Sequence, residues 1–111
     1  MAKDVRGDWT VYQTSGHQVA VHVGDGEDGN GFFGGTAQEQ HSGTGNISDA
    51  KADDSEITFL IGWSNGARGR YTGRFDQWGR MSGVCYDEVH PTSTASWYAK
   101  QPDGNDMFGP M

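Results

Sequence analysis

The sequence lacks the features that mark secreted or membrane proteins. Cys85 is its only cysteine, so an intrachain disulfide and a zinc site built from cysteines are both excluded. The opening residues, MAKDVRGDW, lack the apolar segment of a signal peptide. No stretch approaches the ~18 apolar residues of a membrane-spanning helix. We therefore expect a soluble protein of a reducing compartment, by default the cytoplasm, that does not bind membranes.

Basic residues are also scarce. Eight Lys and Arg stand against fifteen Asp and Glu, which gives a net charge of −7. Nonspecific binding to nucleic acid depends on Lys and Arg, so this balance argues against it. Four arginines against one aspartate give residues 66–84 a local charge of +3. We expect these arginines to pair with carboxylates on a solvated sheet face; the alternative is a stripe that attracts an anionic ligand.

Helical periodicity is almost absent. The one candidate, residues 48–53, begins with the capping residue Ser48 but has no apolar stripe, so it predicts a single turn or a loop. Eighteen glycines without a Gly-X-Y period favour turns and exclude collagen. Five Phe, four Trp and four Tyr argue against disorder. A chain of 111 residues with this composition is expected to form one compact all-β domain.

Short segments with strand character recur about every ten residues. In residues 19–23 valines alternate with other residues, and in 56–63 four apolar side chains share one face. The Asn65-Gly66 pair that follows predicts a type I′ hairpin turn. The expected strands are residues 9–12, 19–23, 32–37, a weak one around 45–47, 56–63, 68–75, 80–87 and 95–99.

Eight short strands without room for crossover helices must be antiparallel. Such a chain removes its exposed edges by closing into an eight-stranded up-and-down β-barrel over residues 7–99. The alternative is a β-sandwich. We expect residues 1–6 to be an N-terminal extension and residues 100–111 a flexible C-terminal tail. A barrel of this size has room inside for side chains or one small ligand.

Several short motifs occur in an order that resembles the avidin group of calycin β-barrels. Gly7-Asp8-Trp9 resembles the G-x-W opening of calycins. The segment 58–63 resembles the avidin strand that ends in a pocket tryptophan, 71–75 resembles the next strand, and Ser96-Trp97 a later one. The resemblance spans most of residues 7–99 and implies the barrel fold.

The resemblance carries over to the avidin ligand site only in part. Trp63 and Trp97 match pocket walls, and Ser15 matches a polar contact. Avidins place an asparagine where this chain has Val11 and a tyrosine where it has Ala37. Since unpaired polar groups of a buried ligand cost about 1–3 kcal/mol each, we expect no tight binding of biotin.

Aromatic and polar residues gather in two predicted loops, 64–68 and 76–79. Trp78 has no strand to bury it, and an exposed loop tryptophan suits stacking on a sugar ring or a partner surface. Asn65 and Arg68 are groups that pair with sugar hydroxyls. We expect a non-enzymatic protein that binds a carbohydrate at one barrel end; the plainer alternative is ordinary turn chemistry and core packing. The candidate binding residues are Trp63, Asn65, Arg68, Tyr71, Asp76, Trp78 and Trp97.

Two other functions stay open. The first is a calycin-type carrier with a cavity of a few hundred Å³ lined by Trp63, Phe59 and Trp97. The second is a small barrel enzyme, of the cyclase or isomerase type, that uses acid–base groups near the end of the seventh strand. The acid–base candidates are Asp87, Glu88 and His90.

No cofactor or metal is indicated by the sequence. The acidic segment 25–30 fails the EF-hand pattern, because position five is Gly29 and position twelve is Thr36. The four histidines do not have zinc-protease spacing. Barrel faces rich in Val, Tyr and Phe also make a homo-oligomer an expected partner state.

Overall fold

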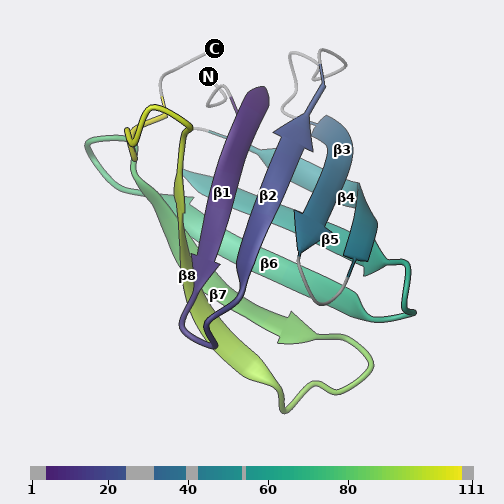
Figure 1. The fold of residues 1–111 in the computed structure, drawn as a ribbon. Coiled ribbons are helices and arrows are strands. Elements are labelled where there is room, and N and C mark those ends of the chain that lie inside the picture. Colours follow the sequence, from purple (N-terminus) through teal and green to yellow (C-terminus); the bar gives the residue numbers. More distant parts are fainter. Residues whose placement is uncertain (1–4, 25–31, 40–42, 54, 109–111) are drawn as a thin grey trace.

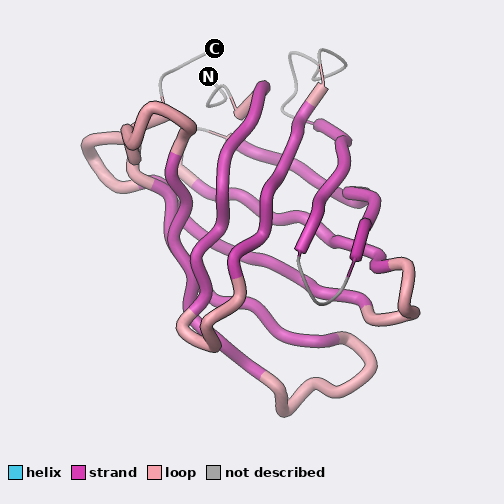
Figure 2. Tube along the Cα trace, in the orientation of Figure 1, coloured by secondary structure: helices cyan, strands magenta, loops and turns pink. Residues whose placement is uncertain are grey.

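The structure is a computed structural model that describes residues 5–24, 32–39, 43–53 and 55–108. Figure 2 shows the described chain as strands and loops. The described residues form no helix, and hence none that is long and apolar enough to span a membrane. The strands are β1 (Gly7–Gln13), β2 (Gln18–Val23), β3 (Phe32–Glu39), β4 (Gly43–Ala52), β5 (Glu56–Trp63), β6 (Arg68–Phe75), β7 (Met81–Asp87) and β8 (Thr94–Lys100).

The eight strands close into one barrel. Each strand pairs antiparallel with the next in sequence, and β1 also pairs with β8, where Val11 lies opposite Ala99 (Figure 1). This confirms the predicted eight-stranded up-and-down barrel. It excludes the sandwich, because two separate sheets would each keep unpaired edges. The barrel is consistent with a calycin-like fold.

The fourth strand corrects one prediction. Residues 48–53 were expected to form a turn or a loop, but most of this segment continues β4. The pairing of β4 with β5 shifts between Ser48 and Lys51, and Asp49 has a φ of 46°. This β-bulge inserts an extra residue and brings Ala50 into the core. The bulge interrupts the alternation of buried and exposed residues, and this explains why the sequence of this polar segment did not predict a strand.

Four turns share one geometry. In each, a glycine N–H donates to the carbonyl three residues earlier, and the glycine φ is between 84° and 94°. The prediction of a type I′ turn at Asn65-Gly66 is therefore wrong, because that turn needs positive φ at both residues and only Gly66 has it. The turns are Gln13–Gly16, Trp63–Gly66, Asp76–Gly79 and Gln101–Gly104.

The segment after β8 returns to the barrel. The structure describes residues 100–108 of the expected tail, of which Lys100 ends β8. Phe108 is buried at one barrel end, where its ring packs against Trp9 and Phe75. The backbone N–H of Phe108 donates to the carbonyl of Gly79 (2.7 Å). These contacts were not expected, because most of this segment is polar and rich in turn formers.

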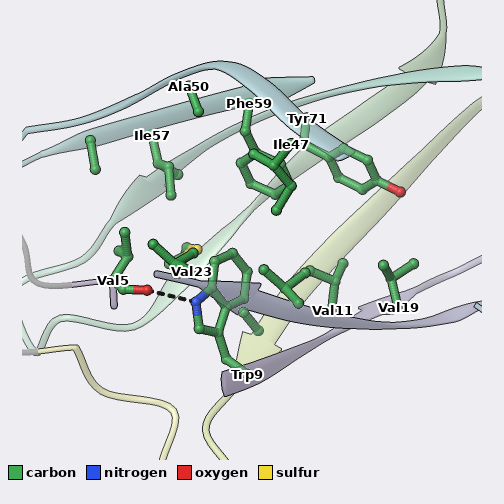
Figure 3. Packing of buried hydrophobic residues seen from close by; sticks show 14 of the residues in the cluster. Val5, Trp9, Val11, Val19, Val23, Ile47, Ala50, Ile57, Phe59 and Tyr71 are labelled. Carbon is green, nitrogen blue, oxygen red and sulfur yellow. Dashed lines mark hydrogen bonds between the residues drawn. The ribbon is translucent and has the colours of Figure 1, made fainter. Parts of the chain in front are cut away.

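An aromatic cluster fills the middle of the barrel. The ring of Phe59 stacks on Tyr71 with centroids 4.8 Å apart, and Trp9 packs edge-on against it at 5.8 Å (Figure 3). Trp97 packs on Phe59 from another side, also at 5.8 Å. The buried indole N–H of Trp9 donates to the carbonyl of Val5 (2.8 Å), which satisfies it. We call the barrel end at Trp9 and Phe108 the closed end and the opposite end the mouth.

Candidate functional site

The mouth holds an open cavity of about 250 Å³. Its walls come from the mouth ends of the strands and from the loops that join β1 to β2, β5 to β6 and β7 to β8. Trp63 is a half-buried aromatic wall, and Tyr71 and Cys85 are buried lining groups. A concave site with aromatic walls and a few polar groups is the usual form of a small-molecule site.

Alternation along the strands explains both the polarity and the space of the mouth. Inward positions are apolar through the core, but at the mouth they become Gln13 on β1, Glu39 on β3 and Asp87 on β7. Two other inward positions, Gly69 and Ala95, have little or no side chain. The small residues leave the space, and the polar residues line it.

Two hydrogen bonds order the cavity lining. The hydroxyl of Tyr71 donates to Oε1 of Gln13 (2.6 Å). A ring nitrogen of His17 lies 3.2 Å from Oε1 of Glu39, whose side chain is 4% exposed. Burial, reinforced by the charges of Cys85 and Glu39, raises the pKa of Tyr71 well above its usual range, so its hydroxyl stays protonated. The lining groups are thus held in place by one another.

Asp87 stays ionised at the mouth. The backbone N–H of Val89 donates to its Oδ1 (2.8 Å), and His90 lies 3.5 Å from its Oδ2. These interactions, the backbone hydrogen bond first, lower the pKa of Asp87. The mouth therefore keeps a carboxylate charge at its rim.

The arginines of β6 pair with carboxylates, as expected. Arg70 lies 2.7 Å from Asp49 and 3.5 Å from Glu88, and Arg68 lies 3.7 Å from Glu88. Arg74 has Glu56 at 3.9 Å. The predicted pairing of these arginines with carboxylates is confirmed; Arg68 and Arg74 are exposed, whereas the side chain of Arg70 is only 15% exposed. The stripe is therefore a weak attractant for an anionic ligand, because neighbouring carboxylates offset its charge.

The structure divides the candidate binding residues among three places. Trp63, Arg68 and Tyr71 line the mouth, while Trp97 is fully buried in the core. Asn65 lies in the loop at the mouth, where its Oδ1 accepts the N–H of Ala67 within the turn. That contact is the ordinary turn chemistry of asparagine.

Asp76 and Trp78 lie at the closed end. Successive loops of an up-and-down barrel alternate between its two ends, so loops 64–68 and 76–79 are separated by the length of β6. The idea that both loops form one site is therefore wrong. Trp78 is exposed as predicted (57%), but it stacks under the guanidinium of Arg80, which also pairs with Asp76 (2.8 Å).

For the carrier and for the enzyme, only some of the residues named from the sequence line the cavity. A cavity of the expected size exists and is lined by Trp63, but Phe59 and Trp97 lie in the filled core and do not line it. Of the proposed acid–base groups, only Asp87 lines the cavity. No group of three or more His, Cys, Asp or Glu side chains within the described ranges could hold a metal ion.

The sequence interpretation missed Gln13, His17 and Glu39 as lining residues. A usable signal was present, because a polar residue at the inward position that ends an alternating strand must face the barrel opening. Gln13 follows Trp9 and Val11 in this series, and Asp87, predicted as an acid–base candidate, ends β7 in the same way.

Cys85 provides a probe of the mouth. Burial raises its pKa to about 11, so we expect alkylation by iodoacetamide to be slow at neutral pH. The rate should rise about tenfold per pH unit well beyond the ordinary thiol range, because only the thiolate reacts. Mass spectrometry measures this directly, with urea-unfolded protein as the fast control. A folded-state rate that levels off near the ordinary pKa of about 8.5 would contradict it.

No family model, no curated protein and no solved structure matches the chain. The resemblance to avidins therefore stays a prediction from the short motifs, and function has to be argued from the mouth.

Proposed function

We propose that the protein binds one small polar ligand in the mouth of its barrel, without catalysis. The observation that supports this is the asymmetry of the barrel: aromatic rings pack across the closed end, whereas the mouth holds a cavity of about 250 Å³. The lining combines an aromatic wall, Trp63, with polar groups that fix orientation. Those polar groups are Gln13, Glu39 and Asp87.

The proposal modifies the carbohydrate and carrier expectations. A sugar that contacts loops 64–68 and 76–79 together has no support, because these loops lie at opposite ends. A single ring-sized molecule against Trp63 fits the cavity. The expected homo-oligomer stays a prediction.

Catalysis is left out because three of the cavity groups have protonation states unsuited to an activated nucleophile or a general acid. Burial keeps Cys85 as a thiol and Tyr71 as a neutral phenol, whereas turn hydrogen bonds keep Asp87 as a carboxylate. An activated nucleophile or a general acid would need shifts in the opposite direction.

The test is a screen of small neutral, cationic and anionic compounds, including monosaccharides, by intrinsic fluorescence and by backbone amide NMR. Binding should shift the amides of the mouth and change the fluorescence of Trp63. The signal should be lost in Trp63→Phe and kept in Trp78→Phe, whose indole lies at the closed end.

A second pair of variants tests occupancy of the cavity itself. Ala95→Leu adds bulk inside the mouth, and we expect it to reduce affinity at least about tenfold by occlusion. Ser96→Leu adds the same bulk on the outer face and should leave binding unchanged. Equal affinity in both variants, or compounds that shift only residues at the closed end, would refute a ligand site in the mouth.

A further inference from the structure

We infer that the ligand of the mouth carries a protonated nitrogen, as a compact amine attached to a flat apolar body does. This inference rests on the proposed function, because it specifies the chemistry of the same cavity. It follows from the charges, the aromatic surface and the size of the mouth.

The charged groups that line the cavity favour a cation. Two carboxylates, Glu39 and Asp87, point inward from β3 and β7, against one guanidinium, Arg68. Arg68 is more than half exposed and lies 3.7 Å from Glu88, so this further carboxylate offsets its charge. His17 is the remaining basic group, and it lies at hydrogen-bond distance from Glu39.

The surroundings of the two carboxyl groups favour an interaction with a cation. Glu39 is almost completely buried, and Asp87 is held ionised by the backbone N–H of Val89. Charge interactions strengthen where water is excluded, and an ammonium partner offsets the cost of burying the Glu39 carboxylate. A carboxylate or phosphate ligand would be repelled here, whereas an ammonium group would gain charge-assisted hydrogen bonds.

The aromatic groups of the mouth also favour a cationic ligand. Trp63 lines the cavity and is half-buried, and Tyr71 lines it while its hydroxyl donates to Gln13. The π face of an aromatic ring attracts cations, and tryptophan does so best. The cavity of about 250 Å³ lies just below the usual range for drug-sized ligands, so we expect a body of about one ring.

The test compares three probes of nearly equal shape on the full chain: benzylamine, benzyl alcohol and benzoate. Methyl glucoside serves as a neutral sugar, and affinities come from Trp63 fluorescence and amide NMR. We expect benzylamine to bind at least about tenfold more tightly than benzyl alcohol, and benzoate not to bind. Added NaCl should weaken the binding of benzylamine more than that of benzyl alcohol.

Variants assign the effect to the two carboxylates. Glu39→Gln and Asp87→Asn should each lower the affinity for benzylamine about tenfold while changing that for benzyl alcohol little. Asp76→Asn, at the closed end, is the matched control and should leave both affinities unchanged. Thermal unfolding checks each variant, and if Glu39→Gln does not fold, the more exposed Asp87 carries the test.

The outcomes separate the inference from the function on which it rests. Equal or tighter binding of benzyl alcohol, methyl glucoside or benzoate at the mouth would overturn the amine and retain a mouth ligand. Failure of all four probes to shift the mouth would overturn the amine, and if the wider screen also failed, the proposed function with it. Loss of benzylamine binding in Asp87→Asn, with Asp76→Asn unaffected, would support both.

Discussion

Replacement of Phe59 by alanine is expected to lower the free energy of unfolding by about 3–5 kcal/mol. Phe59 is fully buried (0% exposed) at the centre of the aromatic cluster. Its ring meets those of Tyr71, Trp9 and Trp97 at 4.8, 5.8 and 5.8 Å. Neighbours fixed in closed strands cannot collapse into the space, so the variant loses both apolar burial and packing.

The measurement is urea unfolding followed by tryptophan fluorescence and circular dichroism. A loss of this size is a large fraction of the ~5–15 kcal/mol typical of a domain, and the variant should be partly unfolded at 37 °C. Phe32→Ala is the control, since Phe32 is 53% exposed and its ring forms a surface cation–π contact with Lys51. We expect it to cost less than about 1 kcal/mol. Similar losses in both variants would refute a core centred on Phe59.

Replacement of Phe108 by alanine is expected to destabilise the barrel by about 3 kcal/mol. Phe108 is 3% exposed, and its ring lies 5.9 Å from that of Trp9 and 6.3 Å from that of Phe75. Its removal opens the closed end and exposes Trp9 to water. The loss lies at the low end of the range for phenylalanine, because a barrel end can relax more than the barrel centre.

Met107→Ala is the matched control for Phe108→Ala. Met107 is 46% exposed although it is adjacent in sequence and forms a backbone bridge with Arg80. It should change the unfolding free energy by less than about 1 kcal/mol. Thermal melts of both variants, with the emission maximum of Trp9 as a local reporter, test the prediction. Wild-type stability in Phe108→Ala would restore the interpretation of this segment as a tail without a structural role.

The strands were predictable because their cause is local. In residues 19–23 and 56–63 the chain alternates in a way that suits one buried and one solvated face, and both segments form strands. The bulge in β4 was not predictable from alternation, because Asp49 breaks the period to place Ala50 in the core. The packing of Phe108 was likewise concealed, since its partners Trp9 and Phe75 are distant in sequence.

The candidate site shows the same limit. Trp63 and Arg68 were predicted, and they line the mouth. Trp78 was predicted to share one barrel end with them, but it lies at the other end. Antiparallel pairing reverses the chain at every loop, and this sends the next loop to the other end.

Patterning of this chain was enough to determine an all-β domain of eight antiparallel strands, because alternation and turn residues act over a few neighbours. The choice of a closed barrel over a sandwich required the pairing of β1 with β8, whose residues are far apart in sequence. Which end of the barrel stays open was decided only by the tertiary structure. Rings from the two chain ends meet over one opening, while Gly69 and Ala95 leave space at the other beside Glu39. Such contacts depend on residues far apart in sequence, and no local pattern encodes them.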